Sequence, residues 1–153
     1  RQMTELAHGA WVLVADGEKA LFLENVTDGQ DPFLRVVRLE SQENPPHGEQ
    51  VSDRPGRMPD TGEGHRSAMQ EPDWHMLAKD RFASELSDIL YRLAGRGAFE
   101  KLVLVAPPKT LGALRDGLHK EVRARVVAEV DKDMTNHPVP KIETLLKAEL
   151  ASR

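Results

Sequence analysis

The first forty residues carry three short apolar runs that turn residues separate. The runs are Ala10–Ala15, Ala20–Val26 and Phe33–Glu40, with Asp16-Gly17 and Thr27–Pro32 between them. Runs rich in β-branched and aromatic residues, bounded by turn residues, are typical of β-strands. We therefore predict a meander of three strands.

The pattern changes to a helical period after Asp73. Asp73 is a good N-cap residue, and Gly95 suits the C′ position that closes a helix. Between them, apolar residues recur every three or four positions, which predicts an amphipathic helix with one buried face. The residues of this face are Leu77, Ala78, Phe82, Leu86, Ile89, Leu90 and Leu93.

The last third of the chain alternates between strand and helix patterns. Lys101–Ala106 is almost entirely apolar, as in a strand buried on both faces, and Pro107-Pro108 then favours the start of a helix over Lys109–Leu118. Arg123–Val130 is predicted to be the last strand. Lys141–Leu150 has an apolar stripe that we expect to dock on the sheet.

The resulting order, β-β-β-loop-α-β-α-β-α, predicts an α/β fold with a mixed five-stranded sheet and packed helices. We expect one domain over residues 1–153, with a long Gly/Pro-rich loop over 41–73. Neither half of the chain has enough apolar residues for a core of its own.

Composition narrows the classes of function. The 153 residues include no cysteine, which excludes disulfides, Cys-ligated zinc and thiol nucleophiles. No apolar run is long enough to span a membrane, and Arg1-Gln2-Met3-Thr4-Glu5 leads into no signal-peptide core. We expect a cytoplasmic protein, and no sequence pattern calls for a cofactor.

Residues 41–73 follow neither a helical nor a strand period. Structureless loops of this length are usually functional or disordered. Residues 41–75 hold seven acidic residues and three arginines, which accounts for the whole net charge of −4. The chain has no general basic surface, so DNA is not expected as a partner.

The loop nevertheless carries groups suited to a partner. Arginine binds planar anions in a bidentate manner, and glycine allows close backbone approach, while histidine exchanges protons near neutral pH. The alternative is structural: the arginines pair with nearby acids, and the loop tip is simply solvated. The candidate binding residues are Asp53, Arg54, Arg57, Gly62, Gly64, His65, Arg66 and His75.

Two further hypotheses concern chemistry. His65, Asp73 and His75, with His47, are residue types that bind metals or serve a hydrolase, but they lack a fixed ligand spacing and no nucleophile-elbow pattern is present. Lys109 follows a predicted central strand, at an edge where α/β proteins bind ligands, and could hold an anion at a helix N-terminus. The alternative is that Pro107-Pro108 only ends the strand and starts the helix, and that Lys109 has no ligand.

Several strings resemble the bacterial host attachment proteins, a family described as required for attachment to host cells. These strings are VADGEKALFLENV, VSDRPGR, DRFASELSDIL, FEKLVLVAPPKTLGALR and VRARVVAEVDKDMT. The resemblance runs from about Trp11 to Leu150. Since the sequence carries no export signal, it implies an indirect role in attachment.

The same element order is remotely similar to the middle domain of archaeal and eukaryotic release factors and of Pelota proteins. Arg81-Phe82-Ala83 lies where their helix motif is expected, whereas the loop reads Thr61-Gly62-Glu63-Gly64-His65-Arg66. The Gly-Gly-Gln of the release factors, which promotes peptidyl-tRNA hydrolysis, is absent. The resemblance therefore implies contact with the ribosome or tRNA without hydrolytic release.

We predict a non-enzymatic binding or regulatory module that contacts its partner through residues 51–75. The rival hypothesis is a metal-dependent or His/Asp hydrolase that uses His65, Asp73 and His75. A third alternative is a partner-binding protein whose contact surface is the outer strand, Phe33–Glu40.

Overall fold

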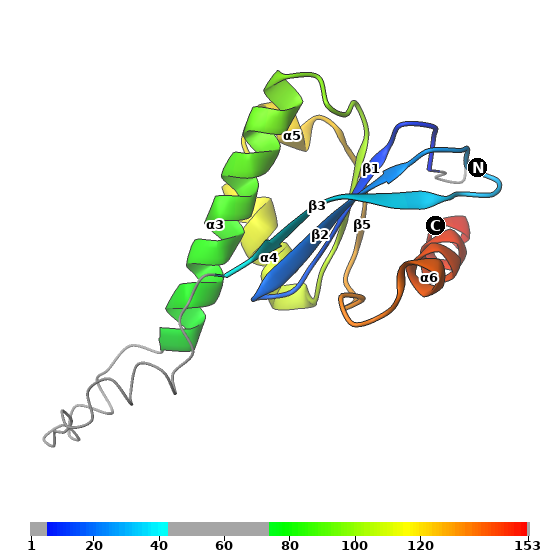
Figure 1. The fold of residues 1–153 in the computed structure, drawn as a ribbon. Coiled ribbons are helices and arrows are strands. Elements are labelled where there is room, and N and C mark those ends of the chain that lie inside the picture. Colours follow the sequence, from blue (N-terminus) through cyan, green and yellow to red (C-terminus); the bar gives the residue numbers. More distant parts are fainter. Residues whose placement is uncertain (1–5, 43–73, 153) are drawn as a thin grey trace, which may run out of the picture.

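The computed structural model describes residues 6–42 and 74–152 (Figure 1). Along the chain the elements are β1 (Trp11–Ala15), β2 (Lys19–Asn25), β3 (Leu34–Ser41), α3 (Trp74–Gly95), β4 (Leu102–Val105), α4 (Pro108–Gly117), α5 (Lys120–Arg123), β5 (Val126–Val130) and α6 (Val139–Ala151). The expected loop over 41–73 begins later than predicted, because Ser41 is still paired with Lys19 as the last residue of β3.

The strands form one sheet in the order β3-β2-β1-β4-β5. The meander β1–β2–β3 is antiparallel, whereas β1, β4 and β5 run parallel. This topology confirms the predicted α/β fold with a mixed five-stranded sheet. We use the term carboxyl edge for the end of the sheet at which β1, β4 and β5 finish, since ligand sites of open α/β sheets gather there.

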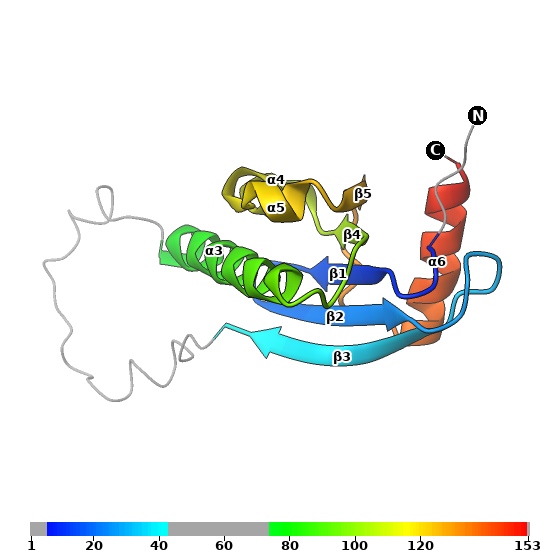
Figure 2. The ribbon, with the colours of Figure 1, turned by 90° about the horizontal axis from the view of Figure 1, so that it is seen from above.

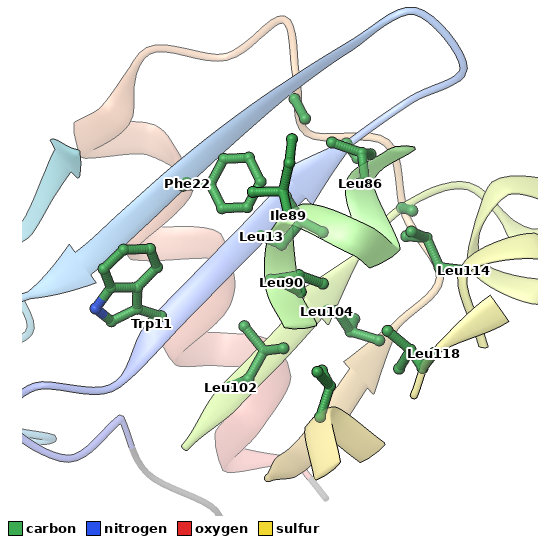
Figure 3. Close-up of a cluster of buried hydrophobic side chains, with 14 of the residues drawn as sticks. Trp11, Leu13, Phe22, Leu86, Ile89, Leu90, Leu102, Leu104, Leu114 and Leu118 are labelled. Atoms are coloured by element: carbon green, nitrogen blue, oxygen red, sulfur yellow. The ribbon is translucent and has the colours of Figure 1, made fainter. Parts of the chain in front are cut away.

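Two hydrophobic cores lie on opposite faces of the sheet. Helices α3, α4 and α5 cover one face, and α6 covers the other (Figures 1 and 2). On the first face, Leu13 and Leu104 pack under Leu90 of α3 (Figure 3). On the second, Val12 packs with Leu146 of α6. Successive strand residues point to opposite faces, so a strand buried on both sides needs the continuous apolar pattern that β1 and β4 have.

The C-terminus of α3 corrects one prediction. Gly95 is still helical, and the C′ residue is Gly97, whose φ of +73° is left-handed. Its N–H donates to the Ala94 carbonyl at 3.0 Å, and the N–H of Ala98 donates to the Leu93 carbonyl at 3.0 Å. These two bonds form a Schellman motif. The sequence pattern predicted Gly95, and the hydrogen bonds show that the C′ position lies two residues later.

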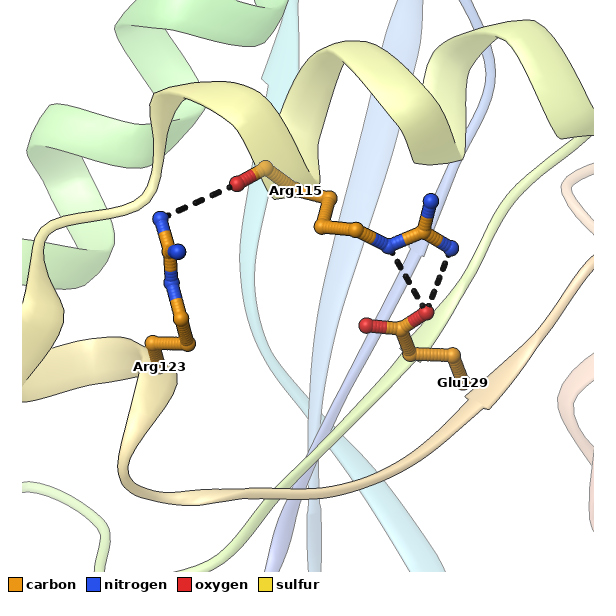
Figure 4. A network of polar contacts seen from close by, with 3 residues as sticks. All are labelled: Arg115, Arg123 and Glu129. Atoms are coloured by element: carbon orange, nitrogen blue, oxygen red, sulfur yellow. Dashed lines mark hydrogen bonds and ion pairs between the residues drawn. The ribbon is translucent and has the colours of Figure 1, made fainter.

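The predicted strand Arg123–Val130 is wrong over its first residues. Arg123 is the last residue of the short helix α5, Ala124 and Arg125 form a turn, and β5 begins at Val126. The Arg123 guanidinium donates to the Leu118 carbonyl at 2.9 Å and to the Arg115 carbonyl at 3.3 Å, which ties α5 to the end of α4 (Figure 4). A four-residue helix is too short to display a helical period, so its pattern resembled a strand.

An ion pair connects α4 to β5 in the same region. Glu129 Oε1 accepts from Arg115 Nη2 at 2.6 Å and from Nε at 3.1 Å (Figure 4). The hydrogen bond to Glu129 and the negative charge of that carboxylate raise the pKa of Arg115. Because Arg115 is exposed and Glu129 is partly exposed, we expect this pair to orient α4 more than to stabilise it.

Candidate binding cleft at the carboxyl edge

A cleft of about 630 Å³ opens at the carboxyl edge. Its walls come from the turn after β1, the first half of α3, the start of α4 and the segment after β5. This volume lies within the usual range of small-molecule sites. The charged lining residues are Asp16, Glu18, Lys79, Asp80, Lys109 and Asp133.

Asp16 builds the turn that forms one wall. Its Oδ1 accepts from the backbone N–H groups of Glu18 and Lys19, both at 2.8 Å. An aspartate that accepts from the backbone two and three residues later fixes a tight turn, as its place between two predicted strands suggests. The N–H of Asp16 also donates to the Lys19 carbonyl at 3.0 Å, which closes the β1–β2 hairpin.

Thr135 links this turn to the segment after β5. Its hydroxyl oxygen lies 2.9 Å from Asp16 Oδ2 and 2.9 Å from Asp133 Oδ1. A hydroxyl carries one proton, so it donates to one of these carboxylates at a time. Thr135 is only 7% exposed, so this link between the two cleft carboxylates is made by a buried side chain.

Gly17 allows α3 to approach the turn closely. A Cβ at this position would lie 2.7 Å from Cγ and Cδ of Lys79. The aliphatic part of Lys79 therefore occupies the space that any larger residue at position 17 would need. This contact places the first half of α3 against the β1–β2 turn.

The cleft carries charges of both signs. Four carboxylates face two ammonium groups among its lining residues. An excess of carboxylates opposes the binding of a simple anion. Lys109 does lie in a cleft, as the hypothesis that it holds an anion requires, but the net charge of the lining does not support that hypothesis. A ligand with a cationic group, or with groups of both signs, suits this lining better.

The ends of the segment 43–73 flank the cleft. Gln42 follows β3, and its N–H donates to the Glu18 carbonyl at 2.8 Å. Trp74 begins α3, only five residues before Lys79 in the cleft wall. Both attachment points therefore lie at the carboxyl edge (Figures 1 and 2). The fold thus joins the sequence-predicted loop to the sheet beside the cleft.

Replacing Asp16 by alanine should destabilise the protein by about 1–2 kcal/mol, because it removes three side-chain hydrogen bonds. The loss is moderate because the N–H groups of Glu18 and Lys19 are exposed and can bond to water instead. Urea denaturation measures the change. The matched control is Glu18→Ala in the same turn, whose carboxylate has no hydrogen bond among the described residues. We expect the control to stay within about 0.5 kcal/mol of the parent. Equal losses would contradict the role given to Asp16.

Most of the sequence-predicted binding residues lie outside the described part of the chain. Asp53, Arg54, Arg57, Gly62, Gly64, His65 and Arg66 all fall within residues 43–73, as do His47 and Asp73. His75 belongs to the first turn of α3, and its side chain is also outside the described part. Lys109 lies in the cleft wall, at the second residue of α4.

Sequence reasoning missed the other cleft residues. The sequence pattern marks Asp16 only as a turn residue, and Lys79 lies outside the apolar face of its helix. Asp16 and Asp133 do share a signal, because each follows a strand that ends at the carboxyl edge. This signal can be recognised only once β1, β4 and β5 are known to be parallel.

Over residues 6–42 and 79–152, whose side chains the structure describes, no group of three or more His, Asp or Glu side chains is arranged to hold a metal ion. That search does not cover the side chains of the metal hypothesis: His47, His65 and Asp73 fall within residues 43–73, and the side chain of His75 is also outside the described part. None of the helices in the described ranges has the length and apolarity to cross a bilayer.

Comparison with known proteins gives a family match over most of the chain. The family model described as "Bacterial archaeo-eukaryotic release factor family 12" matches residues 9–146. No curated protein matches the sequence significantly.

Two solved structures are similar over 94% of this chain, each at 12% sequence identity. One is the crystal structure of archaeal translation termination factor aRF1, with a TM-score of 0.43. The other is described as an archaeal protein, with a TM-score of 0.45. The matched region covers 36% of each of those chains, so this chain spans about a third of their length.

Proposed function

Because the chain belongs to bacterial archaeo-eukaryotic release factor family 12, we propose that it is a non-enzymatic binding or regulatory module that acts on translation by contacting the ribosome or a bound tRNA. The family match over residues 9–146 carries this proposal, and it also confirms the predicted resemblance to release factors. In this proposal the protein works in the cytoplasm, and any effect on attachment to host cells is indirect.

The absence of a hydrolytic motif supports a non-enzymatic role. The sequence contains no Gly-Gly-Gln, and its one Gly-Gln pair, Gly29-Gln30, belongs to the connection between β2 and β3. That connection lies at the end of the sheet opposite the carboxyl edge, since β2 runs antiparallel to β1. It is therefore remote from the segment that joins β3 to α3.

The geometry of the carboxyl edge supports a role for the segment between β3 and α3. Its ends are attached beside the cleft, on elements whose core side chains are buried. In the proposal, Arg54, Arg57 and Arg66 contact phosphate or carboxylate groups of the partner, and His65 and His75 add polar contacts. Asp53, Gly62 and Gly64 shape the backbone around them.

Ribosome co-sedimentation over a range of salt concentrations tests the proposal. We expect the full chain to sediment with ribosomes and the double variant Arg54→Ala/Arg66→Ala to bind more weakly. Two lost phosphate contacts should lower the slope of log affinity against log salt by about two. The equally charged control is Arg92→Ala/Arg96→Ala, at the far end of α3, which should bind as the parent does.

Two outcomes would contradict the proposal. Unchanged sedimentation of Arg54→Ala/Arg66→Ala would remove the role of the segment, and equal weakening of both double variants would indicate non-specific charge attraction. Stoichiometric metal in the purified protein, lost on His75→Ala, would instead favour the hydrolase hypothesis with His65 and Asp73.

A further inference from the structure

Strand β3 forms one border of the sheet and exposes apolar side chains. In the strand order it has β2 on one side and no neighbouring strand of the described residues on the other. Val36 is 39% exposed and Leu39 is 67% exposed. An exposed edge of this kind offers unpaired backbone groups to another strand, which makes it a potential interaction surface.

A β-bulge brings these two apolar side chains onto the same face. Val36 is opposite Leu23 and Leu39 is opposite Leu21, whereas Val37 is the extra residue between them. Leu23 and Leu21 both pack on the α6 side of the sheet, and residues opposite one another share a face. Without the bulge, Val36 and Leu39 would point to opposite faces.

Backbone hydrogen bonds show which residues of β3 turn outward. Phe33 accepts from Val26 and Gln42 donates to Glu18, so both face the β2 side. Along a strand, the backbone N–H and C=O groups of successive residues point alternately toward one neighbouring strand and the other. Alternation from Phe33 forward, and from Gln42 backward, therefore directs the backbone groups of Val36 and of Leu39 away from β2. Leu34 follows the same rule, since its N–H donates to Glu143 Oε2 of α6 at 2.8 Å instead of to a strand.

We propose that β3 is a self-association surface, on which a second copy of this chain pairs its own β3 in antiparallel orientation. The two-fold axis passes through the Val37–Arg38 bulge. Val36 of one copy then lies opposite Leu39 of the other, and each such pair exchanges two backbone hydrogen bonds. This inference is independent of the proposed contact with the ribosome.

Charge complementarity favours a second copy in this register. Arg35 precedes Val36, and Glu40 follows Leu39. In the proposed pairing, Arg35 of one copy therefore lies opposite Glu40 of the other, on the α3 side of the sheet. By symmetry, both the apolar pair and the charged pair occur twice. Within one chain Arg35 bonds Glu24 and Arg38 bonds Glu40, each at 2.7 Å, so these side chains are already held near the edge.

The bulge also explains why the occupant is a copy of the same chain. An extra residue on an edge strand breaks the alternation of a regular partner strand and discourages its pairing. A partner with the same bulge in the facing position restores the alternation on both sides of the axis. The edge is therefore protected against unrelated strands and complementary to itself.

Sedimentation velocity of the full chain at increasing concentration tests the proposal. We expect a monomer–dimer equilibrium that Leu39→Lys weakens at least about tenfold, because symmetry makes each substitution act twice. Val127→Lys is the matched control, since Val127 is an exposed apolar residue, 40% exposed, on the opposite border strand β5. This variant should dimerise as the parent does.

A charge exchange tests the register itself. Arg35→Glu or Glu40→Arg alone places like charges opposite one another and should weaken dimerisation, whereas the double variant should recover it. Recovery is diagnostic because neither substitution restores a pair within one chain. A parent that stays monomeric, a control Val127→Lys that dissociates while Leu39→Lys does not, or a double variant without recovery would each overturn the proposal.

Discussion

Replacing Asn25 by alanine should lower the free energy of unfolding by about 3–5 kcal/mol, since a network of buried polar groups loses its centre. Asn25 is fully buried. Its Nδ2 donates to the Leu6 carbonyl at 2.8 Å and to the Asp28 carbonyl at 3.1 Å. Its Oδ1 accepts from the N–H of Phe33 at 3.0 Å and from that of Thr27 at 3.2 Å.

The reason for the large effect is that one side chain satisfies three segments. It connects the residues before β1 to the β2–β3 loop and fixes where β3 begins. Each buried group that loses its partner costs about 1–3 kcal/mol, and total stabilities are only about 5–15 kcal/mol. Thermal and urea denaturation measure the loss. The control Gln30→Ala lies in the same loop with an exposed side chain and should be nearly neutral.

Asn25→Asp separates hydrogen bonding from shape. Burial raises the pKa of an aspartate, so the charged form is disfavoured in the folded state. The variant should therefore lose stability relative to the parent as the pH rises above roughly 4, where the unfolded aspartate ionises, and recover below it. A pH-independent difference would contradict the role of the Nδ2 donor.

The sequence predicted the fold well where the structure of a segment depends on residues that are close to one another along the chain. The runs of β1 and β4 are apolar at every position, and the stripe of α3 recurs at helical spacing, so both were predictable. Gly97 was not, because the choice between it and Gly95 depends on how far the hydrogen bonds of α3 continue. Helix α5 was missed since four residues hold no period.

The cleft was predictable only in part, because its residues converge from four segments. Lys109 was noted from its place after a buried strand. Asp133 and Lys79 gave no local signal. Asp133 meets Asp16 because β1, β4 and β5 are parallel, and Lys79 reaches the turn because α3 packs against Gly17. Asn25 illustrates the same limit: it is the last residue of a strand, and only its long-range hydrogen bonds, such as that to the Leu6 carbonyl, show that it connects buried segments.

Replacing Leu146 by alanine should cost about 2–5 kcal/mol, because it leaves a cavity in the core between α6 and the sheet. Leu146 is fully buried against β1 and β4, whereas the preceding residue, Leu145, is only partly buried. We expect Leu145→Ala to cost about half as much, since less apolar surface returns to water. Equal costs would mean that burial does not decide the effect.

The same residue tests the arrangement of the two cores. Leu90 packs on the α3 side and Leu146 on the α6 side, with the sheet between them. Substitutions without shared contacts usually add within about 0.5 kcal/mol, so Leu90→Ala/Leu146→Ala should equal the sum of the single losses. A clear departure from additivity would show that the sheet transmits strain from one face to the other. The cleft at the carboxyl edge would then respond to events at α6, because β1 and β4 contribute to both cores.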